Sequence, residues 1–108
     1  MVIEQGATFS LVGTLYNPGT PRVPIDFTDC TARMQARRQQ SSADVLLDFA
    51  PYITLGTTNG KIRVKVPRNI TAPIDWDEAV YDFEYDTPDG DTFRLLVGRI
   101  RVKRVVTR

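Results

Sequence analysis

Histidine is absent from the sequence, and cysteine occurs only once, as Cys30. The lack of histidine removes the serine and cysteine nucleophile systems that depend on an imidazole base, together with most zinc sites. A single cysteine cannot form an internal disulfide, which suits a reducing compartment. We expect Cys30 to be a small core residue on the inward face of a strand, beside Ala32 and Met34, rather than a reactive thiol.

Long apolar runs and targeting segments are also missing. No apolar run approaches the ~20 residues needed to cross a bilayer. The N-terminal "MVIEQGATF" lacks the basic and apolar regions of a signal peptide, so we expect the chain to stay where it is made or to be carried by an assembly. With 108 residues, 42% of them apolar and 25% charged, the chain fits one globular domain over residues 1–108.

The glycines and acids that are present do not have the spacing of a catalytic or ligand-binding motif. The seven glycines are scattered singly, so no phosphate-binding loop is formed. The segment "DTPDGD" lacks the spacing and the distal glutamate of a calcium loop. The carboxylates of Asp82, Glu84 and Asp86 alternate with aromatic residues, which indicates an exposed strand face rather than a general acid–base pair. We therefore predict no enzyme activity, no catalytic residue, no metal, no cofactor and no small-molecule substrate.

What the sequence does contain is a recurring alternation of apolar and polar residues, broken by turn residues about every 8 to 15 positions. This pattern is typical of an all-β fold, and we predict an antiparallel β-sandwich of about seven to nine strands. The segments with the clearest alternation are 8–16, 31–38, 52–66, 79–86 and 92–106, and we expect residues 45–49 to form a short buried segment.

Two local signals between residues 52 and 77 predict a turn and a helix. Asn59-Gly60 tolerates positive φ at both central turn positions and therefore predicts a tight hairpin. Thr71, followed by Ala72 and Pro73, suits a helix N-terminus, so we predict one helical turn near residues 71–77. Trp76 is expected to close one end of the core.

The last strand contains a change of phase. Its apolar residues occupy odd positions up to Val97 and even positions from Ile100 onward. Because side chains alternate strictly along a strand, one extra residue must be absorbed between these two stretches. Glycine is common at β-bulges, so we predict a bulge at Gly98.

Charge is segregated near the C-terminus, although the net charge is only +1. Residues 69–93 contain eight acids and no base, whereas residues 94–108 contain six bases and no acid. We predict that "AVYDFEYD" and "RIRVKR" lie side by side in a hairpin, so that acids meet bases across the strands.

Two other interpretations of the charged and aromatic residues remain open. In the first, the chain contacts DNA through basic strands 61–68 and 99–104, which requires that these strands be neighbours and that the acidic strand lie elsewhere. In the second, Trp76 and the tyrosines bind carbohydrate. The DNA interpretation would use Lys61, Arg63, Lys65, Arg68, Arg99, Arg101 and Lys103.

A succession of short segments carries a resemblance to a known family. In order they are "QGATFSLVGTLY", "PIDFTDCTARMQARR", "GKIRVKVPRNITAPIDW", "YDFEYDTPDGDTFRLLVGRIRV" and "VVTR". This succession resembles small structural proteins of tailed bacteriophages and prophages, and is similar to the immunoglobulin-like N-terminal domain of phage baseplate upper proteins.

The resemblance implies an immunoglobulin-like β-sandwich subunit of a virion, located in a tail, baseplate or collar and made in the host cytoplasm. Its partners would be other virion structural proteins and further copies of itself, with no nucleic acid and no membrane. Because the chain ends directly after the domain, we expect a bridging or ring-forming role. Residues 1–5 and 105–108 are candidates for assembly arms, although they are equally compatible with ordered outer strands.

Overall fold

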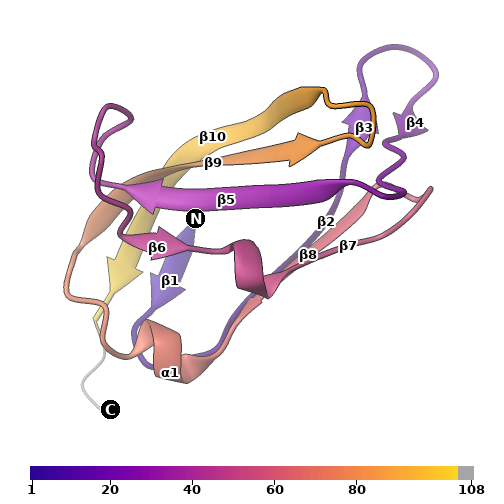
Figure 1. The fold of residues 1–108 in the computed structure, drawn as a ribbon. Helices are drawn as coiled ribbons and strands as arrows, with labels where there is room; N and C mark the ends of the chain where they lie inside the picture. Colours follow the sequence, from indigo (N-terminus) through magenta and orange to yellow (C-terminus); the bar gives the residue numbers. More distant parts are fainter. Residues whose placement is uncertain (105–108) are drawn as a thin grey trace.

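The chain forms two β-sheets that pack face to face, with a small extra hairpin at one end (Figure 1). The computed structural model describes residues 1–104, apart from the side chain of Leu96. The five-stranded sheet has the order β1 (Val2–Glu4), β10 (Thr92–Lys103), β9 (Glu78–Asp86), β5 (Thr31–Arg37) and β6 (Leu47–Asp48). The three-stranded sheet has the order β2 (Phe9–Thr14), β8 (Lys61–Val66) and β7 (Ile53–Leu55), and the small hairpin joins β3 (Tyr16–Asn17) to β4 (Val23–Pro24).

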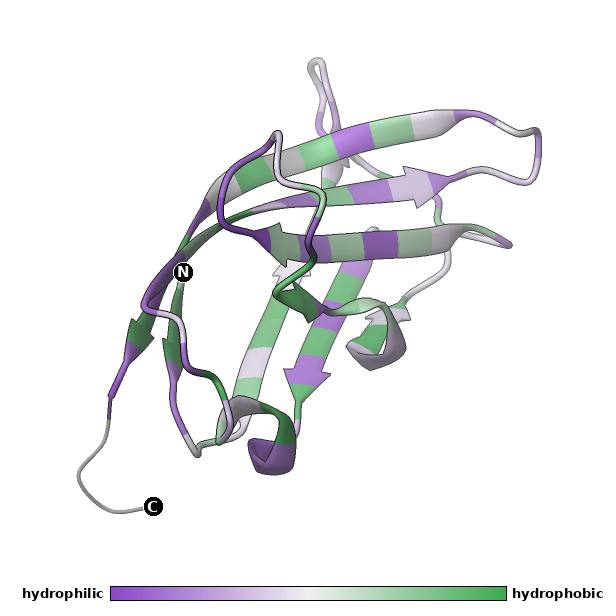
Figure 2. Ribbon diagram, turned by 60° about the vertical axis from the view of Figure 1, so that its left-hand side comes forward, coloured by the Kyte–Doolittle hydropathy of each residue, from purple (hydrophilic) through white to green (hydrophobic). Residues whose placement is uncertain are grey.

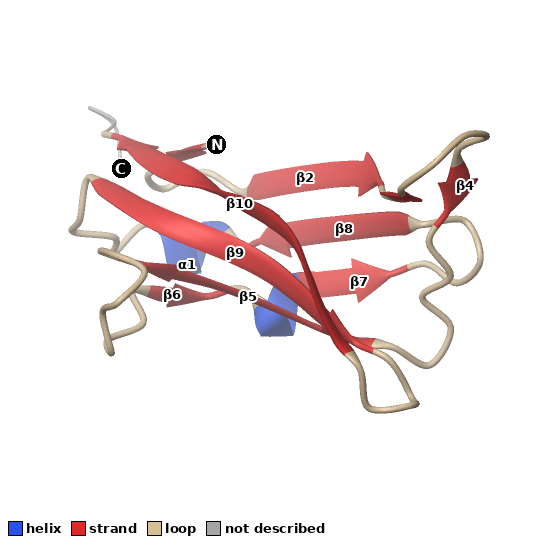
Figure 3. Cartoon of the chain, turned by 90° about the horizontal axis from the view of Figure 1, so that it is seen from above, coloured by secondary structure: helices blue, strands red, loops and turns tan. Residues whose placement is uncertain are grey.

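The predicted all-β class is confirmed, with ten strands in the described part of the chain. This exceeds the predicted number because β1, β3 and β4 are strands of two or three residues that alternation does not reveal. All neighbouring strands pair antiparallel except β1, which pairs parallel with β10. Seen from above, β9 and β10 run obliquely across β2, β8 and β7, so the two layers are distinct (Figure 3).

The core lies between the two sheets and is built from the alternating residues of the long strands. Hydrophobic and hydrophilic residues form successive bands along the strands in Figure 2. On β8 the pattern is strict, with the three apolar side chains buried and the three basic ones exposed. The buried apolar residues that form one cluster include Met34, Ala36, Phe49, Ile62, Val64, Val66, Trp76, Phe83, Tyr85, Ile100 and Val102.

The helical turn is found earlier in the chain than predicted. Helix α1 spans Arg68–Thr71 and begins after Pro67, whose carbonyl accepts hydrogen bonds from the amides of Ile70 and Thr71. The prediction over residues 71–77 is therefore wrong. Pro73 lies beyond the end of the helix, where proline is common because it cannot continue one. Thr71 is fully buried, and its hydroxyl donates to the carbonyl of Ala7 at 2.8 Å.

The hairpin between β7 and β8 is confirmed, but its turn differs from the predicted one. The amide of Gly56 donates to the carbonyl of Lys61, which leaves four residues in the loop instead of two. Gly60 has φ 67°, whereas Asn59 does not share this conformation. A side chain at Gly60 would overlap the carbonyl oxygen of Leu15, so this loop is packed against the chain that follows β2.

The bulge in β10 lies at Leu95 and not at Gly98. Arg94 pairs with Glu84 and Leu96 with Phe83, so the extra residue is absorbed between them. Gly98 is in regular register and lies opposite Tyr81. A Cβ at Gly98 would stand 2.8 Å from Cε1 of Tyr81, so glycine here allows close approach of an aromatic ring.

The N-terminal residues are an integral strand rather than a free arm. The Met1 amino group donates to the carbonyl of Arg99, and the amide of Arg101 donates to the carbonyl of Met1. Ile3 is fully buried in the core. Residues 1–5 therefore match the alternative of an ordered outer strand, at the edge of the five-stranded sheet, whereas residues 105–108 lie outside the described part of the chain.

Candidate functional site

The acidic strand β9 is flanked by basic side chains on both sides. Glu84 lies opposite Arg33 of β5 and opposite Arg94 of β10. One carboxylate oxygen of Glu84 accepts from Arg33 at 3.1 Å, and the other accepts from Arg94 at 2.7 Å. Glu84 therefore links the three strands through a continuous row of charges on the outer face of the five-stranded sheet.

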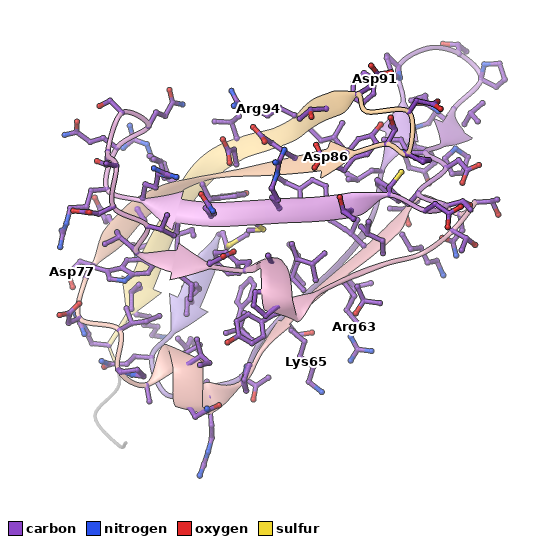
Figure 4. The ribbon with its side chains drawn as sticks, in the orientation of Figure 1. Arg63, Lys65, Asp77, Asp86, Asp91 and Arg94 are labelled. Carbon is purple, nitrogen blue, oxygen red and sulfur yellow. The ribbon has the colours of Figure 1, made fainter. Side chains whose placement is uncertain are left out.

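The same two arginines also reach the other acids of β9. Arg33 contacts Asp86 at 3.0 Å, and Arg94 contacts Asp82 at 3.4 Å. The hydrogen bond to Glu84 raises the pKa of Arg94, and the charges of Asp82 and Glu84 act in the same direction. We call these five residues, Arg33, Asp82, Glu84, Asp86 and Arg94, the charge network; Figure 4 labels Arg94 and Asp86 on adjoining strands of this face.

The predicted pairing of the last two long strands is confirmed, but the partners within it are wrong. Strands β9 and β10 are antiparallel neighbours, so residues 99–101 of β10 lie opposite residues 78–80 of β9 and not opposite its acidic half. Arg101 lies opposite Glu78, and Arg99 lies opposite Val80. Asp82, Glu84 and Asp86 are instead bound by Arg94 and by Arg33 of β5, a strand from the first half of the sequence.

The bases at the end of β10 find partners in other segments. Lys103 lies 4.0 Å from Glu4 of β1, and Arg104 lies 3.1 Å from Asp77. Arg104 also donates to the carbonyl of Ile74 at 2.8 Å. These contacts connect β10 with β1 and with the segment before β9.

A shallow hollow of about 420 Å³ lies over the charge network. Its lining includes Gln35, Arg37 and Tyr81 beside members of the network. Arg37 donates to the carbonyls of Ser42 and Ala43, so it fixes the loop after β5. Because Glu84 and Arg94 are already engaged with each other, this hollow offers paired charges rather than a free carboxylate for acid–base chemistry.

Cys30 is half-buried and packs against the core, close to its predicted position beside Ala32. Burial raises the pKa of its thiol, and the negative charges of Asp26 and Asp29 act in the same direction. The nucleophilic form of cysteine is the thiolate, so these effects make the thiol less reactive. The pKa of Asp26 is lowered because its carboxylate accepts hydrogen bonds from the hydroxyl and the amide of Thr28.

The outer face of the three-stranded sheet carries a row of bases without acids. Lys61, Arg63 and Lys65, here called the basic face, point outward from β8. Arg63 lies between Val12 of β2 and Thr54 of β7, and neither of these strands contains an acid. Within residues 1–104, none of the three takes part in an ion pair. Figure 4 shows Arg63 and Lys65 projecting away from the side that carries Arg94.

The structural condition for a combined DNA-binding face is not met. Strand β8, within the predicted 61–68 segment, belongs to the three-stranded sheet, whereas the 99–104 segment continues β10 of the five-stranded sheet. Since the sheets enclose one core, their outer faces lie on opposite sides of the sandwich. The acidic strand β9 is also the direct neighbour of β10.

The aromatic residues named for carbohydrate binding lie mostly inside. Trp76 is 6% exposed and Tyr85 is 7% exposed, so neither presents a ring face to a sugar. The ring of Tyr85 packs edge-on against Phe27, with centroids 5.1 Å apart. These rings therefore build the core, as the sequence alternation indicated.

Neither a metal-binding cluster nor a membrane-spanning helix occurs among the described residues. Residues 1–104 contain no group of three or more histidine, cysteine or acidic side chains placed to hold a metal ion. They also contain no helix with the length and apolar character of a membrane span.

No protein-family model matches the chain, and no curated protein is significantly similar to it.

Proposed function

We propose that the chain is a non-enzymatic structural subunit of a tailed-phage virion, with an immunoglobulin-like sandwich that acts through protein–protein assembly. It would be made in the host cytoplasm and incorporated into a tail, baseplate or collar. The order of sequence segments that resembles phage structural proteins supports this assignment. The position of the most acidic strand, β9, inside the five-stranded sheet between β10 and β5 also supports it.

The observation that carries the proposal is the position of Glu84 between Arg33 and Arg94. A site for an external ligand needs charges that remain free, whereas these hold three strands together. At the same time, β2 forms one edge of its sheet, with six residues paired on one side only. Unpaired edge strands are a common means by which domains join neighbouring chains.

Particles of the phage or prophage that encodes the chain provide the direct test. We expect mass spectrometry of purified particles to detect the chain, and an epitope-tagged copy to be labelled at one defined place in electron micrographs. Deletion of the gene is expected to yield particles without that part, or no assembled tails. Infectious particles that lack the protein altogether would overturn the proposal.

One observation favours a second candidate function, contact with DNA through the basic face alone. Lys61, Arg63 and Lys65 are free of ion pairs among the described residues, and every second residue of a strand points to the same side. Three phosphate contacts would weaken binding about 40-fold between 0.05 and 0.2 M salt. A mobility-shift assay with duplex DNA tests this candidate, and the absence of any shift at 0.05 M salt would exclude it.

A further inference from the structure

We propose that the basic face binds the acidic end of a second copy of this chain, so that subunits associate head to tail. This inference rests on the proposed structural function and names one partner for it. The acidic end, here called the acidic tip, consists of Asp29, Asp89 and Asp91, all exposed.

The acidic tip brings together two loops that are distant in sequence. Thr31, at the start of β5, pairs with Asp86 at the end of β9, so the loop before β5 lies beside the turn after β9. The contact between Phe27 and Tyr85 joins the same two segments. Asp29, Asp89 and Asp91 form no ion pair within residues 1–104.

The two surfaces are matched in charge and in apolar content. Each has three charged residues of a single sign without ion-pair partners in the described part of the chain, although the whole molecule has a net charge of only +1. Each also has one exposed apolar side chain nearby. Val12 is 67% exposed on the basic face, and Phe93 is 46% exposed against Tyr85 near the acidic tip.

The two surfaces lie on different parts of the molecule, so a single contact between two copies leaves one basic face and one acidic tip free. Arg63 and Lys65 project from the three-stranded sheet, whereas Asp91 lies at the end of the five-stranded one (Figure 4). A contact between two different surfaces of the same molecule is heterologous, and it leads to a closed ring or an open filament. Either product is compatible with the protein–protein assembly proposed above.

Two complementary variants, each with one of the two surfaces neutralised, test this arrangement. The basic-face variant carries Lys61→Gln, Arg63→Gln and Lys65→Gln, and its acidic tip is intact. The tip variant carries Asp29→Asn, Asp89→Asn and Asp91→Asn, and its basic face is intact. Asparagine suits position 29, where Asp29 has φ 58°, a conformation that asparagine tolerates. All six side chains are exposed, and circular dichroism checks that both variants fold.

Sedimentation velocity and light scattering measure the outcome. At 0.01 M salt we expect the natural chain to form oligomers that grow with concentration, and at 1 M salt to be monomeric, because the screening length falls from about 30 Å to about 3 Å. Each variant alone should associate roughly 3- to 150-fold more weakly, which corresponds to three exposed ion pairs. Mixed in equal amounts, the two variants should form a 1:1 dimer, in which the intact acidic tip of one binds the intact basic face of the other. This dimer should grow no further, because both intact surfaces are then occupied.

A matched control separates local complementarity from net charge. Arg99→Gln, Arg101→Gln and Lys103→Gln remove the same charge from the opposite outer face, and this variant should oligomerise like the natural chain. The proposal is overturned if the natural chain stays monomeric at 0.01 M salt and about 1 mM protein, if the control loses association equally, or if the mixture yields no dimer. Retardation of duplex DNA by a monomeric natural chain would assign the basic face to nucleic acid instead.

The outcomes for this inference and for the proposed function are distinct. A chain found in particles but monomeric in isolation leaves the virion role intact and removes the head-to-tail contact. A chain that associates head to tail but is missing from particles supports the head-to-tail contact and removes the virion role.

Discussion

Replacement of Gly98 by alanine tests the register of the last hairpin, because this register places Gly98 opposite Tyr81. The added methyl group would stand 2.8 Å from Cε1 and 3.0 Å from Cζ and the hydroxyl oxygen of Tyr81. These distances are too short for a Cβ contact, so the tyrosine ring has to move. Overpacking of this kind costs about 1–3 kcal/mol. For a domain of this size, that corresponds to a fall in Tm of roughly 4–20 °C.

Gly13 provides the matched control, since it also lies within a strand and has nothing within 4 Å of the position that an alanine methyl group would occupy. Gly13→Ala should stabilise the protein by about 0.4–1 kcal/mol, because alanine restricts the unfolded chain. Urea unfolding followed by circular dichroism measures both variants. In a Tyr81→Ala background, Gly98→Ala should lose most of its cost. If Gly98→Ala and Gly13→Ala stabilise the protein equally, Tyr81 does not face Gly98 and the register is wrong.

Three further predictions concern the core, the pH dependence and the thiol. Ile3→Ala should lower the free energy of unfolding by about 2–5 kcal/mol, because Ile3 is fully buried; a cost below about 0.5 kcal/mol, roughly that of an exposed site, would show that β1 is not part of the core. The pKa of Asp26 is lowered in the folded state, so its contribution to stability is present above the ordinary carboxylate pKa and is lost as pH falls through the lowered value. Asp26→Asn should therefore reduce the acid sensitivity of urea unfolding, and unchanged pH dependence would contradict the role of Thr28 as its hydrogen-bond donor. Cys30 should react slowly with a thiol reagent near neutral pH and much faster after unfolding, since its pKa is raised; equal rates in both states would contradict this.

The strands and their inward faces could be predicted from the sequence because alternation is a local signal. On β8 and β5 the residues expected inside, such as Val64 and Met34, are buried. The phase change in β10 was also visible, but its location was not. Leu95, Leu96 and Val97 are consecutive apolar residues, so the pattern allows the extra residue to be absorbed at several positions. Glycine is frequent in bulges, which favoured Gly98 as the position of the bulge, whereas in the structure Gly98 accommodates the ring of Tyr81.

The helix was misplaced because two prolines compete for the same local signal. Pro67 and Pro73 both precede residues that are compatible with a helical turn, and the sequence does not say which of them begins it. In the structure Thr71 is the last residue of the helix, and its buried hydroxyl donates to the carbonyl of Ala7, a residue 64 positions away. Contacts between residues this far apart in the sequence cannot be predicted from local sequence patterns.

The charge network was only partly predictable for the same reason. The turn after β9 fixes which residues of β9 and β10 face each other, so the pairing of Arg94 with Glu84 follows from a hairpin closed near Gly90. The contribution of Arg33 does not follow, because it requires that β5 lie beside β9. Alternation in "TARMQARR" places Arg33 on the outward face but does not identify the neighbouring strand.

The central claim is that Glu84 of β9 is bound by arginines of both neighbouring strands. The most direct test compares the unfolding free energies of Glu84→Gln and Glu78→Gln at 0.01 and 1 M salt. Glu78 is the control because it is on the same strand and forms no ion pair within residues 1–104. We predict that Glu84→Gln costs about 0.5–2 kcal/mol more than Glu78→Gln at low salt, and that the difference shrinks at high salt. Equal costs for the two variants at both salt concentrations would contradict the account.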